Sequence, residues 1–303
     1  MNHALTTPGQ SRRGFTLVEL LAAMILFSMI IGMTAWAVIG ATDTTAGAEK
    51  QMDTTMQARA FLDRFGADLN NMMDEGGLTA LYYSNTSDSA GNSAIGFVCQ
   101  SRPRTNSGDS RGAVVGYRIN DASDLSATYP MISRGDAELR FSSSMKTIMD
   151  NASSDLLDGG SRIFNWQVLG TGIIRFHISF LLNTGKIVQT PPDYKTPTED
   201  IFPKGVNTGS CKFIPFRAED SSDANRDYVV GLIASIAVLD TRTRDQAFKS
   251  DSTFAGKFER PPASGTNSEK TALSVWNEKL LTANVSKPVR ANIRFYERMY
   301  TVR

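Results

Sequence analysis

An uninterrupted apolar segment near the N-terminus restricts the fold of this chain more than any other feature of its sequence. No charged residue occurs from Leu20 to Ala41, and most of the side chains between them are large and apolar. About 20 helical residues cross a hydrocarbon core of roughly 30 Å, because each residue adds about 1.5 Å. We therefore expect this segment to form one transmembrane helix.

The residues before the segment are basic. Arg12 and Arg13 lie there, and residues 1–14 contain no aspartate or glutamate. Positive charge on the short side of a membrane span favours a cytoplasmic N-terminus. The chain from Asp43 onward is then expected to be exported.

One ionisable residue, Glu19, lies inside the apolar stretch, where a charge is costly. If the chain is cut between Gly14 and Phe15, the new Phe15 amine lies four residues before Glu19 on the same helix face, and the two charges offset each other. In a staggered array of helices, Glu19 could equally pair with the Phe15 amine of a neighbouring subunit. Glu19 is thus a candidate determinant of assembly.

The run from Arg13 to Leu21, RGFTLVELL, closely resembles the prepilin cleavage and N-methylation motif of type IV pilins and type II secretion pseudopilins. The resemblance implies cleavage after Gly14, N-methylation of Phe15 by a prepilin peptidase/methyltransferase, and a filament register set by Glu19. It further implies two other partners, namely sister pilin or pseudopilin subunits and an inner-membrane assembly platform. The protein is then expected in the inner membrane, with its C-terminal head in the periplasm or in a surface filament.

Other interpretations fit the same residues. Ser11 to Phe15 also matches a twin-arginine export signal, and Ala35-Trp36-Ala37 could be an A-x-A peptidase site. A plain uncleaved anchor is the third alternative. The acid at Glu19 and the length of the apolar run favour the prepilin interpretation.

The helical pattern continues past the membrane segment. Apolar residues recur every three to five positions, and Gly76-Gly77 is a stop signal. The recurring residues are Met52, Met56, Phe61, Phe65, Leu69 and Met72. We expect this stripe to pack on a sheet. The predicted parts are a leader at 1–14, a transmembrane and assembly helix at 15–41, an amphipathic extension of that helix at 42–76, and an exported globular head at 77–303.

After Gly77 the pattern becomes that of strands. Alternation over residues 174–183 predicts a half-buried antiparallel strand that ends in a turn at 183–185, and residues 228–239, which are apolar on both faces, predict a central strand. Alternation over residues 289–296 predicts a C-terminal strand, and the spacing in 271–281 predicts a surface helix. Weaker strand patterns cover 95–99, 114–120 and 164–169. A long helix followed by antiparallel strands is an α+β architecture.

The C-terminal half resembles larger minor pseudopilins of the J type, and also a prepilin-like cassette family known as Verru_Chthon. The segments that carry this resemblance are 64–69, 173–182, 231–241 and 293–302.

Candidate chemistry is sparse. The 32 basic and 31 acidic residues balance, so no nucleic-acid partner is expected, and Arg102, Arg104 and Arg111 are interpreted as a solvated loop. His177 is the single histidine beyond the leader, and we expect it to be an exposed structural residue of the strand. No nucleotide-binding or hydrolase motif follows a suitable strand. We therefore expect no enzymatic activity and no catalytic residue.

Two further groups of residues are of interest. Asp223, Asn225 and Asp227 resemble the start of a calcium loop, but Tyr228 and Ala234 occupy its glycine and glutamate positions, so calcium is only a weak candidate and no cofactor is expected. Cys99 and Cys211 would meet an oxidising compartment after export, where they could form a disulfide or stay buried as thiols.

The resulting hypothesis is a minor pilin or pseudopilin, a structural subunit of a type II secretion or type IV pilus-like filament. The alternative is a membrane-tethered binding or enzyme domain that uses the helix only as an anchor.

Overall fold

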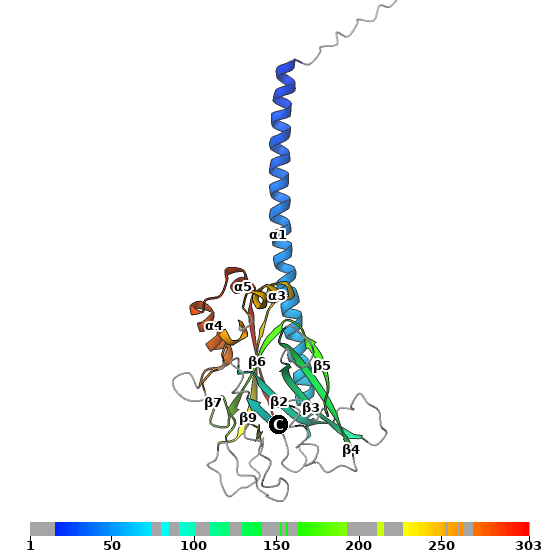
Figure 1. Ribbon diagram of the computed structural model, residues 1–303, viewed down its shortest axis with the longest axis vertical. Helices are drawn as coiled ribbons and strands as arrows, with labels where there is room; N and C mark the ends of the chain where they lie inside the picture. Colours follow the sequence, from blue (N-terminus) through cyan, green and yellow to red (C-terminus); the bar gives the residue numbers. More distant parts are fainter. Residues whose placement is uncertain are drawn as a thin grey trace, which may run out of the picture. The chain divides into compact units, whose positions relative to one another are not determined.

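The computed structural model describes residues 16–73, 80–84, 91–100, 110–120, 129–140, 152, 156, 163–192, 211–214, 227–251, 254–259, 261–262 and 269–302. One helix, α1, runs from Leu17 to Asn70 (Figure 1). The chain divides into two compact units, residues 1–50 and residues 51–303, so α1 begins in the first unit and ends in the second. The second unit is called the head below.

The head contains two antiparallel sheets, which confirms the predicted α+β class. The six-stranded sheet has the order β5-β4-β3-β2-β1-β8, and the four-stranded sheet has the order β10-β9-β6-β7. The strands are β1 (Ala80–Ser84), β2 (Ser93–Cys99), β3 (Ser110–Asn120), β4 (Met131–Arg140), β5 (Asn165–Gly170), β6 (Ile173–Leu182), β7 (Ile187–Val188), β8 (Cys211–Ile214), β9 (Val229–Val238) and β10 (Arg294–Thr301).

The second half of α1 packs against both sheets. The ring of Phe65 lies 5.0 Å from that of Tyr117 in the six-stranded sheet and 6.1 Å from that of Phe176 in the four-stranded sheet, centroid to centroid. Phe61, one turn earlier, contacts the same two rings. Full burial of one such side chain contributes about 1.5–3 kcal/mol. The core of the head is therefore built around α1.

The buried face of α1 differs in part from the predicted stripe. Met52 and Met56 are 64% and 59% exposed, so the expectation that the whole stripe packs on a sheet is wrong at its start. Thr54 and Ala58 are buried on this part of the helix instead. Small side chains at these positions let the helix backbone come close to the sheets, which leaves the methionines on the outer face.

Strand β6 is buried on both faces, although the alternation of its residues predicted a half-buried strand. Phe176 and Ile178 belong to the apolar core around α1. On the other face, His177 and Ser179 are fully buried, and both contact the side chain of Gln189. Polar residues alternate with apolar ones along a strand whether its polar face is buried or exposed to solvent. The sequence pattern therefore did not show that the polar face of β6 is buried.

Among the described residues between β9 and β10, four segments are helical, namely α3 (Thr241–Ser250), η1 (Phe254–Lys257), α4 (Ala272–Thr282) and α5 (Lys287–Asn292). They form a second apolar core with one end of the four-stranded sheet. Helix α4 confirms the surface helix predicted at 271–281. Helix α5 contradicts the prediction, because a strand was expected to begin at residue 289. Pro288 fits the first turn of a helix, and the C-terminal strand begins only at Arg294.

Helix α1 also ends earlier than the glycine pair that was expected to stop it. Its last residue is Asn70, and the backbone then pairs with the end of β2. Met73 N donates to Val98 O at 2.8 Å, and Gln100 N donates to Asn71 O at 2.9 Å. The backbone groups of Asn71 and Met73 thus form hydrogen bonds with residues at the end of β2 and do not continue the helix.

Candidate functional site

The first turn of α1 is closed by a reciprocal pair of hydrogen bonds between Thr16 and Glu19. Thr16 N donates to Glu19 Oε2 at 3.0 Å, and Glu19 N donates to Thr16 Oγ1 at 3.3 Å. Thr16 Oγ1 also lies 3.2 Å from Glu19 Oε2, and Thr16 O accepts the first helical bond from Leu20 N. This is a capping box, in which a helix start satisfies its own orphan N–H groups.

The capping box gives Glu19 a role within its own chain that sequence reasoning missed. The spacing Thr-x-x-Glu was the available signal. The capping box holds the Glu19 carboxylate at the first turn of α1, where the helix dipole favours negative charge. Gly14 and Phe15, the predicted cleavage and methylation residues, lie outside the described residues.

The apolar segment that follows has an exposed surface throughout. Every residue from Leu17 to Glu49 is exposed. By length and composition, α1 is the one helix of the described residues that could cross a membrane, and none of its apolar window is buried within the chain. This exposed apolar surface fits a single-pass membrane anchor.

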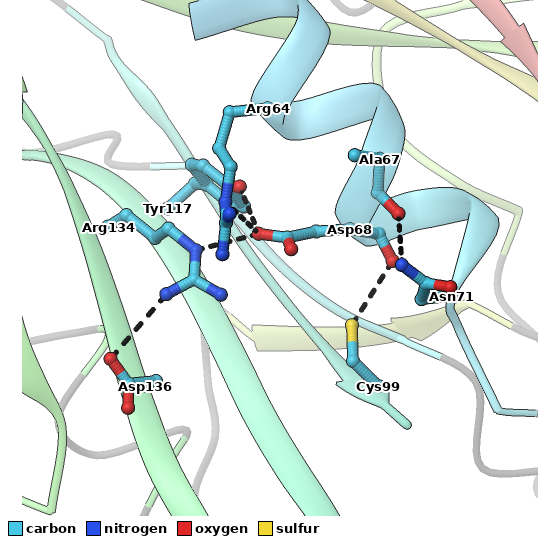
Figure 2. Close-up of polar contacts among 8 residues, drawn as sticks. All are labelled: Arg64, Ala67, Asp68, Asn71, Cys99, Tyr117, Arg134 and Asp136. Atoms are coloured by element: carbon cyan, nitrogen blue, oxygen red, sulfur yellow. Dashed lines mark hydrogen bonds and ion pairs between the residues drawn. The ribbon is translucent and has the colours of Figure 1, made fainter. Parts of the chain in front are cut away.

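A buried polar cluster joins the last turns of α1 to the six-stranded sheet (Figure 2). Asp68 is 2% exposed, and its Oδ2 accepts hydrogen bonds from the Tyr117 hydroxyl at 2.5 Å and from Arg134 Nε at 2.7 Å. Arg64 Nε lies 3.5 Å from the same oxygen, and Arg134 Nη1 lies 3.5 Å from Asp136 Oδ1. The carboxylate therefore links α1 to β3 and β4. None of these residues was recognised from the sequence, where they show no motif.

Electrostatics keep the protons of this cluster in place. Burial, reinforced by the charge of Asp68, raises the pKa of Tyr117 far above its ordinary value. Burial opposes the charge of Arg134, but its hydrogen bond and attraction to Asp68 outweigh that effect and raise the pKa of Arg134. Tyr117 thus stays a neutral donor and Arg134 a cation, as the buried carboxylate requires.

The C-terminal strand β10 holds α1 from the other sheet. The Tyr300 hydroxyl donates to Leu62 O at 2.6 Å, and the Tyr296 hydroxyl lies 3.0 Å from Thr55 Oγ1. Arg298 forms an ion pair with Asp63, and both side chains are mostly exposed. These contacts span residues 55–63, whereas the Asp68 cluster holds the end of the helix.

The structure does not bring the two cysteines together. Cys211 is paired with Tyr83 of β1, which is paired with Ala94 of β2, whereas Cys99 lies at the opposite end of β2. Five residues along a strand and two strands across amount to roughly 19 Å between the Cα atoms, whereas a disulfide needs less than about 7 Å. Cys99 is a buried free thiol whose Sγ donates to Asp68 O at 3.2 Å, so the disulfide considered from the sequence is not formed here.

Most of the remaining sequence candidates lie outside the part of the chain that the structure describes. Asp223 and Asn225 lie outside the described residues, as do Arg102, Arg104 and the side chain of Arg111, and Asp227 is exposed. Within the described part of the chain, no group of three or more histidine, cysteine or acidic residues could hold a metal ion.

The prediction for His177 was wrong, because this residue was expected to be exposed and is fully buried. Its Nδ1 lies 3.2 Å from Ser93 Oγ, and its Nε2 lies 2.8 Å from Gln189 Oε1. The imidazole thus connects β6 to a residue of the other sheet and to the segment after β7.

Comparisons with known proteins agree with the motif at the N-terminus. Residues 9–35 match the family model of the prokaryotic N-terminal methylation motif. Among solved structures, a type IV-like pilin from Thermus thermophilus is similar over 84% of this chain and 94% of that chain, with 10% identity and a TM-score of 0.34. None of the curated proteins matches the sequence.

The matched residues contain Gly14, Phe15 and Glu19 together with the start of the exposed apolar helix. This N-terminal segment is therefore a prepilin-type methylation motif.

Proposed function

We propose that this chain is a minor pilin or pseudopilin, a structural subunit of a type II secretion or type IV pilus-like filament. The observation that carries the proposal is the N-terminal methylation motif at residues 9–35, continued by a helix that is exposed from Leu17 to Glu49. A helix used for assembly needs both an exposed apolar surface and a specific N-terminal processing motif. A domain that was merely tethered would need only the apolar surface.

In this proposal, processing creates the start of the helix. A prepilin peptidase/methyltransferase cleaves after Gly14 and methylates the amine of Phe15. The new amine then lies next to Thr16, whose backbone N–H already donates to the Glu19 carboxylate. The capping box supports the proposal because it holds that carboxylate at the end of the chain where the amine is formed.

Anchoring and assembly use the same segment. Arg12 and Arg13 keep the leader in the cytoplasm, the helix spans the inner membrane, and the head is exported. Subunits pack laterally through their helices, and Glu19 of one meets the Phe15 amine of the next. Their partners are sister subunits and an inner-membrane assembly platform.

The head has a structural role in this proposal and carries no active site of its own. Its relationship to J-type minor pseudopilins or to the Verru_Chthon cassette proteins is part of the proposal. The Asp68 cluster and the contacts of β10 support the structural role of the head, because they fix the head to the helix through which the subunit assembles.

Processing tests the proposal directly. The N-terminus of the membrane-purified protein is determined by intact mass and N-terminal analysis, and the expected product starts at N-methylated Phe15. Gly14→Val should leave the precursor uncut, because a branched side chain crowds the peptidase site. Gly9→Val, in the same leader, is the matched control and should be cut normally.

Two results would contradict the proposal. A protein that starts at residue 38 would indicate cleavage after Ala35-Trp36-Ala37, and an intact Met1 would indicate a plain anchor. In either case the tethered-domain alternative would replace the filament subunit.

A further inference from the structure

Positive charge is concentrated in the segment that leads from β9 into β10. Residues 241–294 contain ten lysines and arginines and five aspartates and glutamates, whereas the whole chain has 32 and 31. Five of these cations are exposed and have no ion pair among the residues that the structure describes. They are Arg242 and Lys249 on α3, Lys287 and Arg290 on α5, and Arg294 at the start of β10. We call these five residues the basic face.

Contacts between α3, α5 and the start of β10 hold the basic face together. Asn292 Nδ2 donates to Thr243 Oγ1 at 3.3 Å, which joins the end of α5 to the start of α3. Arg294 Nη1 donates to Ala291 O at 2.7 Å, so this guanidinium stays beside α5. Figure 1 shows α3 and α5 next to each other in the head. Like charges held on adjacent helices repel one another, so a surface that carries many negative charges stabilises them.

An exposed leucine lies near these cations. Arg290 Nη2 donates to Ala283 O at 3.1 Å, which brings the guanidinium to the end of α4. Leu281, two residues before Ala283, is 77% exposed, more than any other large apolar side chain in the described part of the head. A basic surface with an exposed apolar side chain is typical of segments that lie on a bilayer, where the cations meet the headgroups and the apolar group reaches the acyl boundary. A small acidic ligand would leave the leucine in water.

The basic face lies at the end of the head where α1 enters it. Arg244 of α3 donates to Thr171 O, and the next residue, Gly172, donates its N–H to Gln57 Oε1 at 2.9 Å. Asp53, one turn earlier on α1, accepts hydrogen bonds from Gln57 Nε2 at 3.0 and 3.1 Å and has no ion pair with the basic face among the described residues. The helix that enters the head therefore leaves the five cations without a partner.

The chain itself limits how far this end of the head can lie from the membrane anchor. Gln57 is less than two turns from Gln51, the first residue of the head. Residues 42–50 separate Gln51 from Ala41, the last residue of the apolar run, and as part of α1 they span about 14 Å. This tether sets the limit irrespective of the angle between the two units.

We propose that the basic face binds the anionic lipid headgroups of the bilayer in which the chain is anchored. The contact rests on the proposed function in one respect, since it needs α1 as a membrane anchor, but it needs no filament. Each lysine or arginine close to an anionic surface strengthens the attraction about fivefold. Salt screens exposed charges, so the contact is reversible. It holds this end of the head on the bilayer until the subunit leaves the membrane.

Lysine acetylation of the full chain in lipid nanodiscs measures the contact. Discs that hold one copy exclude contacts between copies, and the two bilayers compared are phosphatidylcholine alone and phosphatidylcholine with an equal amount of phosphatidylglycerol. A water-soluble reagent acetylates exposed amines, and mass spectrometry gives the rate at each lysine. We expect Lys249 and Lys287 to react about threefold more slowly in the anionic discs, with the difference lost at high salt.

Lys186 is the matched internal control. It is exposed in the turn after β6, whereas Gly172, which contacts α1, precedes the same strand. The length of β6, about 33 Å, therefore separates Lys186 from the end of the head where α1 enters. Its acetylation should proceed at the same rate in both bilayers.

Two results would overturn the proposal. The first is equal acetylation of Lys249 and Lys287 in the neutral and anionic discs. The second is protection of both lysines in native membranes that is absent from the anionic discs, because it would assign the basic face to an acidic protein.

Charge variants give the second arm. Arg242→Glu with Arg290→Glu should abolish the protection of Lys249 and Lys287, since attraction to the headgroups becomes repulsion at two positions. Arg242→Lys with Arg290→Lys keeps the charge and should be protected like the parent, which separates loss of charge from loss of the Arg290 hydrogen bond to Ala283. Full protection of the glutamate variant would refute the contact.

The results separate the lipid contact from the function on which it rests. A chain that enters neither bilayer would refute the membrane anchor, and with it both proposals. An inserted chain without lipid-dependent protection would refute the basic-face contact alone. An uncut chain that retains Met1 but shows the protection would refute the filament subunit and leave the lipid contact standing.

Discussion

The hydroxyl of Tyr117 on β3 donates a 2.5 Å hydrogen bond to the buried carboxylate of Asp68 in the last turn of α1. Arg134 of β4 donates to the same oxygen, so one carboxylate links the helix to two strands of the six-stranded sheet (Figure 2). This cluster is the polar part of the contact between α1 and the six-stranded sheet.

Substitution of Asp68 should therefore destabilise the head. Asp68→Asn removes the counter-charge of buried Arg134, and loss of one partner from a buried pair costs about 3–5 kcal/mol. Urea denaturation of the detergent-solubilised chain, followed by tryptophan fluorescence, gives the free energy of unfolding. Asp63→Asn is the matched control, because Asp63 pairs with Arg298 at the surface and should contribute less than about 1 kcal/mol. Equal losses in the two variants would refute the proposed importance of the cluster.

Variants at the first turn of α1 separate capping from charge. Glu19→Gln retains a side chain that can accept from Thr16 N, whereas Glu19→Ala removes both the cap and the charge. If the charge meets the amine of a neighbour, both variants should insert and fold but fail to crosslink to sister subunits. Thr16→Ala, which weakens the cap and keeps the charge, should retain assembly. Normal assembly of Glu19→Gln would show that capping, and not the charge, is what matters.

A close approach between α1 and β10 predicts a strict requirement for glycine. A Cβ at Gly66 would lie 2.6 Å from Cε1 of Tyr300, whose hydroxyl is held by Leu62 O. Gly66→Ala should thus lower the free energy of unfolding of the head by about 1–3 kcal/mol through overpacking. Gly47→Ala provides the control, since nothing lies within 4 Å of its added Cβ, and alanine favours a helix. The idea fails if Gly66→Ala is as stable as the parent.

The pKa of Cys99 predicts alkaline instability. Burial, with a contribution from Asp68, raises the pKa of this thiol from 9.0 to about 12. The unfolded chain releases the thiol proton more readily, so the stability is fully present below about pH 8.5 and is lost as the pH rises through the folded value. At about 1.4 kcal/mol per pH unit, the loss reaches about 4 kcal/mol near pH 12.

Unfolding by urea at pH 7, 8.5 and 10 tests this expectation. The parent should lose stability between pH 8.5 and 10, whereas Cys99→Ala, which lacks the thiol, should show a flatter profile over that interval. Buried tyrosines begin to contribute near pH 10, but they do so equally in parent and variant, so the difference between the two profiles reports the thiol. Identical slopes for parent and variant would show that the buried thiol does not govern the alkaline limit.

Local patterns were sufficient for the elements that depend on short-range sequence. The apolar run that begins at Leu20 requires a helix, and the motif around Gly14 and Glu19 identified a prepilin-type start. The positions of β6, β9 and α4 were also predicted correctly, because each is set by the pattern of its own residues. The burial of β6 on both faces was not predicted.

Contacts between distant segments decided the rest. Met52 lies outside the core and His177 inside it because of what packs nearby, and neither side chain carries that information in its own neighbourhood. Asp68 looks like any acid of an amphipathic helix until Tyr117 and Arg134, which lie 49 and 66 residues away, meet it. The separation of Cys99 from Cys211 follows from strand order alone. Sequence fixes a periodicity along one segment, whereas burial and pairing depend on which other segments lie against it, and only the tertiary structure supplies those.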